Sequence, residues 1–393
     1  MIDPGPMFVK ETLLHLGQCT KTPGAWDDGS HMVDEAAVRT ALAGVEHPEL
    51  RLPITELGMV RGVLLDHGHA QLSIALLAQG YPLREVLRAG IVDAVRALGV
   101  ERVMVDFTTL TDTERSALRK RLQTDVPPVE AFAATRVFAV ASGKGGVGKS
   151  SLSVNLAVAM ARRGKRVAIL DADVYGFSVP RMLGVDRTPL ILDGLLIPPE
   201  VEGVAVVSVG FFVDEGTPVI WRGPMLHKML KQFVDDVWWG KPDVLLVDMP
   251  PGTGDVSLTL SELLPTAELV IVTTPQPAAQ RVAQRAAYMG RRIKMHIAGV
   301  VENMSWFTGK DGERYELFGR GGGELLAAEL GVPLLGCIPL VPALREGGDL
   351  GTPIVVSDPT SEAAVALHGV AVALLEQRPA KIRRPELRIL STS

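Results

Sequence analysis

Residues 142–150 read Ser142-Gly143-Lys144-Gly145-Gly146-Val147-Gly148-Lys149-Ser150. They contain the pattern G-x-x-x-x-G-K-S, directly after the apolar run 137–141 and before a stretch of helical spacing that begins near Lys149. Glycines let successive backbone N–H groups turn inward toward phosphate oxygens, and the N-terminus of a helix adds partial positive charge. A glycine-rich turn without a ligand is the alternative, but the flanking strand and helix favour a phosphate-binding loop.

The residues of this loop predict a triphosphate site that works with Mg²⁺. We expect Lys149 to reach the β- and γ-phosphates of ATP and the Ser150 hydroxyl to bind the metal ion. The candidate nucleotide-binding residues of the loop are Gly143, Lys144, Gly145, Gly146, Val147, Gly148, Lys149, Ser150 and Ser151. The pattern disfavours a dinucleotide-binding oxidoreductase, because such enzymes carry the different spacing G-x-G-x-x-G.

Apolar runs alternate with amphipathic helical stretches around the loop, which predicts an α/β fold with a doubly wound, mostly parallel sheet. The runs are too continuously apolar for half-exposed antiparallel strands. The clearest predicted strands are 137–141, 167–170, 244–247, 269–272 and 297–301.

Acidic residues follow two of these strands, Asp171 and Asp173 after one and Asp248 after the other. Carboxylates at the carboxyl edge of a parallel sheet lie beside the phosphate loop, where they can hold Mg²⁺ or orient water. A single aspartate in such a place is more often a turn or capping residue, but two flanking strands favour function. We therefore expect Ser150, Asp171 and Asp248 to bind the metal, and residues 250–255 to form a loop that senses the γ-phosphate.

Residues 33–123 predict a small α+β domain. Asp34 is placed to cap a helix, and Thr111 with Glu114 forms a capping box before another helix. Two strands, a helix and a third strand are expected between them, at 59–65, 70–77, 83–98 and 102–107.

The remaining boundaries follow from composition. Gly29-Ser30-His31-Met32 is typical of a cloning scar, so residues 1–32 are interpreted as a vector leader. We expect a linker at 124–135, a P-loop ATPase domain at 136–378 and a basic tail at 379–393.

Charge and composition exclude several classes of protein. The 393 residues carry a net charge of -5, so a large basic field for nucleic-acid binding is absent from the sequence. No run of eighteen apolar residues is present, which predicts no membrane span. The two cysteines, Cys19 and Cys337, indicate a reducing compartment, so we expect a cytoplasmic protein without a disulfide framework.

Lys144 is an additional lysine that an ordinary phosphate loop does not need, and S-G-K-G-G-V-G-K-S resembles the deviant Walker A class of MinD, ParA, the arsenite-pump ATPase and the nitrogenase iron protein. Further motifs narrow the resemblance to the Mrp/ApbC iron–sulfur cluster carrier ATPases. These motifs are D-A-D-V-Y-G-F-S-V-P at 171–180, W-R-G-P-M at 221–225, D-M-P-P-G-T-G-D at 248–255, E-N-M-S at 302–305 and F-G-R-G-G-G at 318–323. The segment P-I-T-E-L-G-M-V at 53–60 resembles the small iron–sulfur-assembly domain that often precedes such ATPases.

The resemblance implies an ATP-hydrolysing homodimer that assembles or transfers iron–sulfur clusters to apoprotein partners. It implies that Lys144 acts on the partner subunit's phosphates, that Lys149 and Ser150 act within their own subunit, and that Asp173 positions the attacking water. By the same resemblance Asp248 supports the Mg²⁺ shell. Asn303 would contact the adenine, although a residue there can also be a simple loop-entry residue.

Two features depart from that family. Many members carry C-x-x-C between the E-N-M-S and F-G-x-G-G-G motifs, where two subunits together bridge a [4Fe–4S] cluster, but residues 306–317 contain neither cysteine nor histidine. The small domain usually has a cysteine before a proline, and here the dipeptide is Tyr81-Pro82. We expect Cys337 to be buried in the core and His67 with His69 to form a polar hairpin turn rather than a metal site.

Three functions therefore remain in competition. The first is a nucleotide-gated iron–sulfur carrier, and the second is an ATP-driven dimer switch that acts on a protein partner without binding a cluster. The third, a membrane-cycling regulator, needs an amphipathic C-terminal helix, which Pro379 and Pro385 would break. We rank it last.

Overall fold

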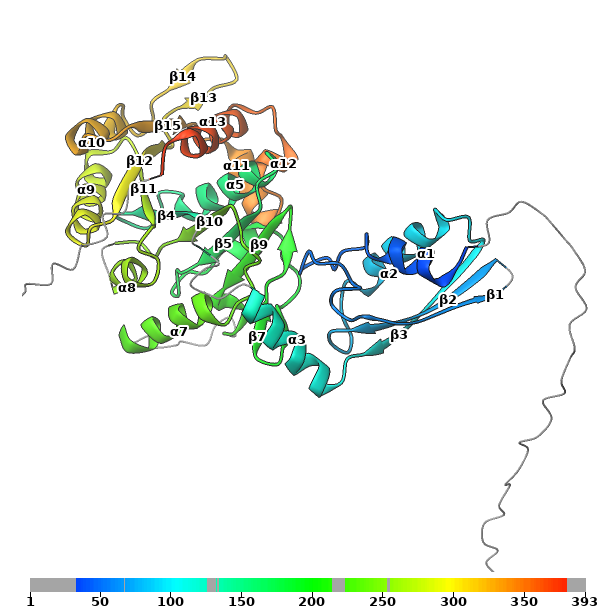
Figure 1. Ribbon diagram of the computed structural model, residues 1–393. Helices are drawn as coiled ribbons and strands as arrows, with labels where there is room; N and C mark the ends of the chain where they lie inside the picture. Colours follow the sequence, from blue (N-terminus) through cyan, green and yellow to red (C-terminus); the bar gives the residue numbers. More distant parts are fainter. Residues whose placement is uncertain are drawn as a thin grey trace, which may run out of the picture.

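The computed structural model describes residues 33–379 apart from 67, 126–131, 133, 214–222, 253 and 254. It shows a large α/β part and a smaller part that contains the first three strands (Figure 1). The expected leader, the tail beyond residue 379, the motif residues Trp221 and Arg222 and most of the linker lie outside the described residues. The domain boundaries themselves stay predictions.

The small part has the predicted order of elements. Helix α1 (Glu35–Leu42) begins at Asp34, whose side chain accepts a hydrogen bond from the Ala37 N–H at 2.7 Å. The Thr111–Glu114 capping box also forms, with the Thr111 N–H donating to Glu114 at 2.9 Å. The other elements are β1 (Val60–Asp66), β2 (His69–Leu76), α2 (Arg84–Arg96), β3 (Arg102–Thr109) and α3 (Asp112–Asp125). Strand β2 lies in the middle of this sheet, antiparallel to β1 and parallel to β3.

The large part is built on one eight-stranded sheet with the order β15-β12-β11-β4-β10-β5-β9-β8. Pairing is parallel except between β8 and β9, so the predicted doubly wound, mostly parallel fold is confirmed. All five predicted strands are present and buried because helices cover both faces of the sheet. The strands are β4 (Arg136–Ser142), β5 (Val167–Asp171), β8 (Glu200–Val201), β9 (Val204–Ser208), β10 (Val244–Asp248), β11 (Glu268–Thr273), β12 (His296–Asn303) and β15 (Leu334–Ile338).

Two hydrophobic cores lie on the two faces of this sheet. One face packs against α5 (Lys149–Ala161), α6 (Val179–Met182), α12 (Ile354–Ser357) and α13 (Glu362–Glu376). The other face packs against α7 (Gly223–Asp235), α8 (Asp255–Leu263), α9 (Pro277–Arg292) and α10 (Gly322–Leu330). Helix α11 (Pro342–Leu350) lies beside α6. This arrangement places the carboxyl ends of the central strands, and the loop after β4, at one edge of the sheet.

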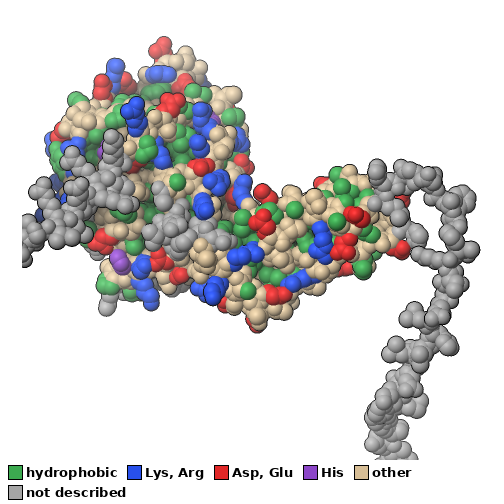
Figure 2. Space-filling view, in the orientation of Figure 1, with side chains coloured by type: hydrophobic (Ala, Val, Ile, Leu, Met, Phe, Trp, Pro, Cys, Tyr) green, Lys and Arg blue, Asp and Glu red, His purple; other side chains and the backbone are tan. Residues whose placement is uncertain are grey.

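The core of the small part is completed by the large part. Leu192, Leu195, Ile197 and Trp238 belong to the same buried cluster as the small sheet and its helices. Three of these residues lie on the hairpin of β6 (Leu190–Leu192) and β7 (Leu195–Ile197). Figure 2 shows acidic and basic side chains next to one another where the two parts meet.

Cys337 is not the fully buried core residue expected from its apolar surroundings in sequence. It lies on β15, which is the edge strand of the large sheet, and its side chain is only half-buried. An edge strand has a neighbour on one side only, so apolar residues in sequence do not guarantee burial there. Burial and the Glu302 carboxylate nevertheless raise the pKa of the Cys337 thiol. Among the described residues, no helix combines the length and apolar character needed to cross a lipid bilayer.

Candidate nucleotide-binding site

The loop between β4 and α5 has the backbone that phosphate binding needs. Gly146 and Gly148 adopt φ angles of 78° and 82°, which glycine reaches without steric cost. Open space surrounds Gly145 and Gly146. Gly143 packs so closely on α9 that a Cβ there would lie 2.2 Å from the carbonyl carbon of Val282. Only glycine fits at that position.

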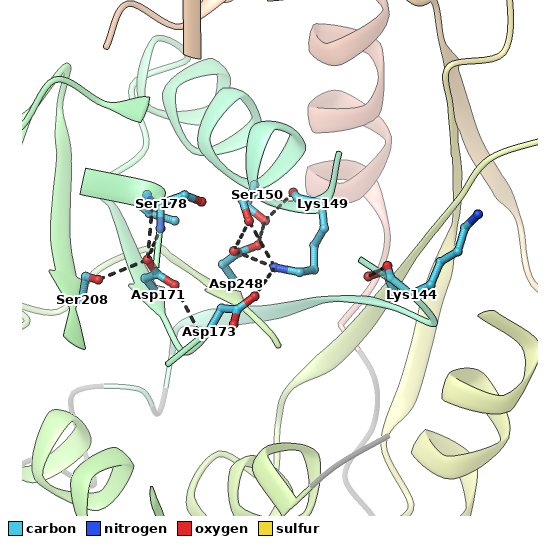
Figure 3. A network of polar contacts seen from close by, with 11 residues as sticks. Lys144, Lys149, Ser150, Asp171, Asp173, Ser178, Ser208 and Asp248 are labelled. Atoms are coloured by element: carbon cyan, nitrogen blue, oxygen red, sulfur yellow. Dashed lines mark hydrogen bonds and ion pairs between the residues drawn. The ribbon is translucent and has the colours of Figure 1, made fainter. Parts of the chain in front are cut away.

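Lys149, the first residue of α5, meets Asp248 at the end of β10 (Figure 3). The Lys149 ammonium donates to Asp248 Oδ2 at 2.7 Å, and the Ser150 hydroxyl donates to the same oxygen at 2.6 Å. The other oxygen, Oδ1, accepts from the Ser153 hydroxyl at 2.6 Å. The structure thus joins the predicted phosphate lysine, the predicted metal serine and one predicted metal aspartate in one network.

Because Lys149 and Asp248 are both buried, each of the two charges depends on the other for compensation. Lys149 is 7% exposed and Asp248 is 0% exposed. Removing one partner of a buried ion pair typically costs about 3–5 kcal/mol, because the other charge is left without compensation. Lys149 therefore needs an anionic partner at all times, whether that partner is Asp248 or a phosphate oxygen.

Asp171, the last residue of β5, holds the turn that follows it. Its Oδ2 accepts from the N–H groups of Ser178 and Val179 at 3.1 and 3.3 Å and from the Ser208 hydroxyl at 3.1 Å, and its Oδ1 accepts from the Asp173 N–H at 3.2 Å. Burial and the nearby Asp248 carboxylate raise the pKa of Asp171 to about 7. These contacts give Asp171 a clear role in positioning residues 173–179, while its predicted role as a metal ligand stays a prediction.

Asp173 faces the same network from the turn after β5 (Figure 3). Its carboxylate lies 3.9 Å from the Lys149 ammonium. The whole Asp173 residue is 8% exposed. Burial raises the pKa of Asp173, and the Lys149 charge opposes that effect. Asp173 therefore lies next to the predicted phosphate lysine, and its expected role in positioning the attacking water stays a prediction.

Lys144 points away from this network, as Figure 3 shows. Its ammonium donates to Gln276 Oε1 at 3.2 Å, at the start of α9. The two lysines of the loop are therefore separated in space: Lys149 turns toward the chain's own strand ends and Lys144 turns outward.

Asn303 lies under the loop, at the end of β12. Its amide nitrogen donates to the Val147 carbonyl at 2.8 Å, and the residue is 4% exposed. A Cβ on Gly148 would come within 2.2 Å of that same nitrogen. The contact supports the loop from below, and the adenine contact expected for Asn303 stays a prediction. Ser151 lies half-buried in the first turn of α5.

Three polar residues of the site were missed from the sequence. Ser153 follows Lys149 by four residues on α5, so helical spacing could have indicated that both side chains reach the same carboxylate. Ser208 and Gln276 carry no such signal, because they reach Asp171 and Lys144 from β9 and from the start of α9.

The predicted sensing loop is only partly described. The Gly252 N–H donates to the Ser142 carbonyl at 2.9 Å, which ties this loop to the start of the phosphate loop. Thr253, Gly254 and the side chain of Asp255 lie outside the described residues.

No thiolate cluster site is found among the described residues. No group of three or more His, Cys, Asp or Glu side chains in that part of the chain is arranged to hold a metal ion. In the interval where many members of the resembled family carry C-x-x-C, this chain forms the hairpin of β13 (Phe307–Thr308) and β14 (Arg314–Tyr315). Arg314 stacks over Trp306 at 4.3 Å, and the Trp306 indole donates to Glu362 at 3.0 Å.

Two family models match separate stretches of this chain. Residues 133–375 match the model of the family described as the NUBPL iron-transfer P-loop NTPase, and residues 35–107 match the iron–sulfur cluster assembly protein family. The iron–sulfur cluster carrier protein of Mycobacterium tuberculosis is 48% identical over 356 residues, which cover 87% of this chain and 93% of the relative. The iron–sulfur cluster carrier protein of Bacillus subtilis is 43% identical over 79% of this chain and 89% of its own length. A nucleotide-binding protein from Archaeoglobus fulgidus, solved in complex with ADP, aligns with 61% of this chain and 91% of its own at 34% identity and a TM-score of 0.49.

Proposed function

This chain belongs to the iron–sulfur cluster carrier family of P-loop NTPases, and we propose that it hydrolyses ATP with Mg²⁺ as a homodimeric switch that drives cluster transfer to acceptor proteins. The observation that carries the nucleotide part is the contact of Lys149 and Ser150 with Asp248, beside a glycine loop that has open space at Gly145 and Gly146. The cluster-transfer part rests on the family.

Lys149 is the residue through which we propose that nucleotide is sensed. A triphosphate entering the loop offers the ammonium a second anionic partner, so Lys149 can leave Asp248 without becoming an unpaired buried charge. Asp248 is then free to orient the metal shell beside Ser150. Mg²⁺, when bound, neutralises charge on the phosphate oxygens, and Ser150 with Asp248 offers the oxygen ligands that this cation prefers.

We propose that Asp173 orients the attacking water. It enters the site from the turn that Asp171 holds, and its raised pKa reflects a carboxylate partly shielded from solvent. Orientation of the nucleophile by such a residue is a recurring part of phosphoryl transfer, where the protein acts mainly by positioning and by electrostatic stabilisation.

We propose that Lys144 completes the site of a second subunit. Its outward direction and its contact with Gln276 keep it away from its own Asp248, so it is available to a partner that approaches the same edge of the sheet. A lysine that contacts phosphate across the interface would link nucleotide binding to dimer closure.

The cluster part of the function needs ligands from outside the described residues of this chain. Cys337 is the single cysteine among the described residues. The residue opposite it on the neighbouring strand β12 is Glu302, so no second thiol lies beside it in the sheet. A bridged [4Fe–4S] cluster takes two thiolates from each subunit. We therefore propose that the cluster is cargo held together with a partner protein or with external thiols.

The test of the nucleotide function is Lys149→Ala. Without the ammonium, the loop cannot neutralise charge on the β- and γ-phosphates, and loss of such a stabilising group costs about 10²–10³ in turnover. Phosphate release in the presence of Mg²⁺ measures the effect. Arg39→Ala is a matched control, because it also removes one positive charge but lies in an exposed ion pair of α1. Hydrolysis by Lys149→Ala near the wild-type rate would contradict the assignment.

A further inference from the structure

Residues 172–203, which connect β5 to β9, join the nucleotide site to the small part of the molecule. We call them the bridging segment. Its first end is held by Asp171, whose Oδ2 accepts the backbone N–H groups of Ser178 and Val179, the residues at which α6 begins. The position of α6 is therefore tied directly to a carboxylate at the end of β5, beside Asp248 in the sheet.

The far end of the bridging segment carries two ion pairs to the small part. The Arg187 guanidinium contacts Glu49 Oε1 at 3.3 Å and donates to the Glu200 carbonyl at 2.7 Å. Arg51 of the small part donates from Nε to Glu200 Oε2 at 2.8 Å. The small part and the bridging segment thus each contribute one arginine and one glutamate. Together the two ion pairs fix the position and orientation of the small part on the bridging segment.

A hairpin of the same segment makes further contacts. The Ser116 hydroxyl of α3 donates to Asp193 Oδ2 at 2.8 Å, and Arg119 of α3 donates to the Asp193 carbonyl. Leu192 and Leu195 are buried in the core of the small part. The small part is therefore seated on the bridging segment by polar and by apolar contacts.

Burial makes the Glu49–Arg187 pair sensitive to small displacements. The Glu49 side chain is 3% exposed and also accepts from the Tyr81 hydroxyl at 3.3 Å. Burial raises the pKa of Glu49, and the Arg187 guanidinium opposes that effect. Separation of the two side chains would leave buried charge unpaired.

The junction is not packed solid. A cleft of about 900 Å³ lies between the two parts, lined by Glu46, Arg51 and Arg121 on one side and by Lys165, Arg166 and Lys241 on the other. The mixed charges at this junction are visible in Figure 2. The cleft leaves room for the small part to shift. The Leu196 N–H donates to the Asp236 carbonyl and the Leu196 carbonyl accepts from the Trp238 N–H, each at 2.8 Å, so the hairpin stays anchored to the large part.

We propose that the bridging segment transmits nucleotide occupancy to the small part, so that phosphate bound beside Asp171 and Asp173 changes how the small part is docked. This inference rests on the proposed nucleotide function. Residues 173–179 are held by Asp171, and the docking residues Arg187, Asp193 and Glu200 follow on the same segment. A change at the first end therefore reaches Arg187 through residues 174–186, which include α6.

Thermodynamic linkage lets the proposal be tested both through the docking of the small part and through nucleotide affinity. If nucleotide changes the docking equilibrium, loss of docking must change nucleotide affinity by the same factor, and coupling of this kind is typically about 5- to 150-fold. The docking contact must be broken at a residue outside the nucleotide site. Arg51 is suitable because its side chain is half exposed, so folding tolerates its replacement.

The experiment compares the full-length wild type with Arg51→Glu, with the charge-swapped pair Arg51→Glu/Glu200→Arg, and with Arg39→Glu. The last variant makes the same charge change in an exposed ion pair within α1. Hydrogen exchange of residues 45–57 is measured with and without a non-hydrolysable ATP analogue and Mg²⁺. The Kd of that analogue is measured by titration for each protein.

We expect the analogue to change exchange at 45–57 in the wild type and in Arg39→Glu. In Arg51→Glu we expect that response to be lost and the Kd to change by about fivefold or more. The charge-swapped pair should recover part of both effects. Binding of the analogue with unchanged exchange at 45–57 in the wild type would overturn the inference alone. Failure of the wild type to bind the analogue would overturn the proposed nucleotide function and the inference with it.

Discussion

Replacement of Ser153 by alanine tests whether Asp248 must be held at both carboxylate oxygens. The buried Ser153 hydroxyl donates to Oδ1 at 2.6 Å, while Lys149 and Ser150 occupy Oδ2. A hydrogen bond to a charged group contributes about 1.5–3 kcal/mol. If the whole free energy of that hydrogen bond stabilises the transition state, its loss lowers turnover about 13- to 160-fold, since 1.36 kcal/mol corresponds to about tenfold. Nucleotide affinity should change little, because Lys149 and the loop N–H groups remain.

The assay is steady-state phosphate release at saturating ATP and Mg²⁺, with the Kd of a fluorescent ATP analogue measured separately. Ser208→Ala is the matched control, because Ser208 is equally buried and donates to Asp171 Oδ2 at 3.1 Å. Both variants should lose a similar free energy of unfolding, about 1.5–3 kcal/mol. Ser208→Ala should turn over ATP close to the wild-type rate, because three backbone N–H groups still hold Asp171. Equal losses of turnover in the two variants, or normal turnover in Ser153→Ala, would refute the reasoning.

Four further predictions follow from the site and the fold. Lys144→Ala should still bind nucleotide but fail to close the dimer with a non-hydrolysable ATP analogue; sedimentation measures this, and wild-type dimerisation would show that the lysine is only solvated. Asp173→Asn should keep nucleotide affinity while phosphate release slows, because only the orientation of water is lost; loss of binding itself would show a structural role. Burial lowers the pKa of His47 from 6.5 to about 4, so the unfolded chain takes up a proton first as pH falls. The contribution of His47 to the free energy of unfolding should then decline by about 3 kcal/mol between pH 6.5 and 4. Chemical denaturation measures it as the difference between the wild type and His47→Asn at each pH, because other groups, Asp171 among them, titrate equally in both proteins. In His47→Asn the amide oxygen can replace Nδ1 as acceptor for the Glu49 and Leu50 N–H groups. Anaerobic reconstitution of the chain freed of residues 1–32, without added thiol ligands, should load less than one cluster per dimer by iron content and absorbance, and a stoichiometric chromophore that survives Cys337→Ser would contradict this.

Most secondary structure could be predicted because its signals are local. Asp34 and the Thr111–Glu114 pair cap their helices through residues three positions away, and the apolar runs of the large sheet are each continuous in sequence. Cys337 shows where this reasoning fails. Its apolar neighbours predicted burial, but β15 is an edge strand, and the place of a strand in a sheet is not a local property.

The amino-acid sequence by itself determined the phosphate-loop pattern and the alternation of strands and helices. It also predicted the candidate site residues Lys149, Ser150, Asp171, Asp173 and Asp248. Glycine spacing, apolar periodicity and acidic strand ends act over a few residues, so they can be read along the chain. Only the tertiary structure decided which side chains meet. The strand order brings Ser208 to Asp171 and Asp248 to Lys149, and the packing of the small part against the large part brings Arg187 to Glu49. These contacts join residues 37 to 138 positions apart. These contacts depend on how the sheets and helices pack as layers. The free energy that selects one strand order comes from many buried side chains along the whole chain, so no single segment determines it.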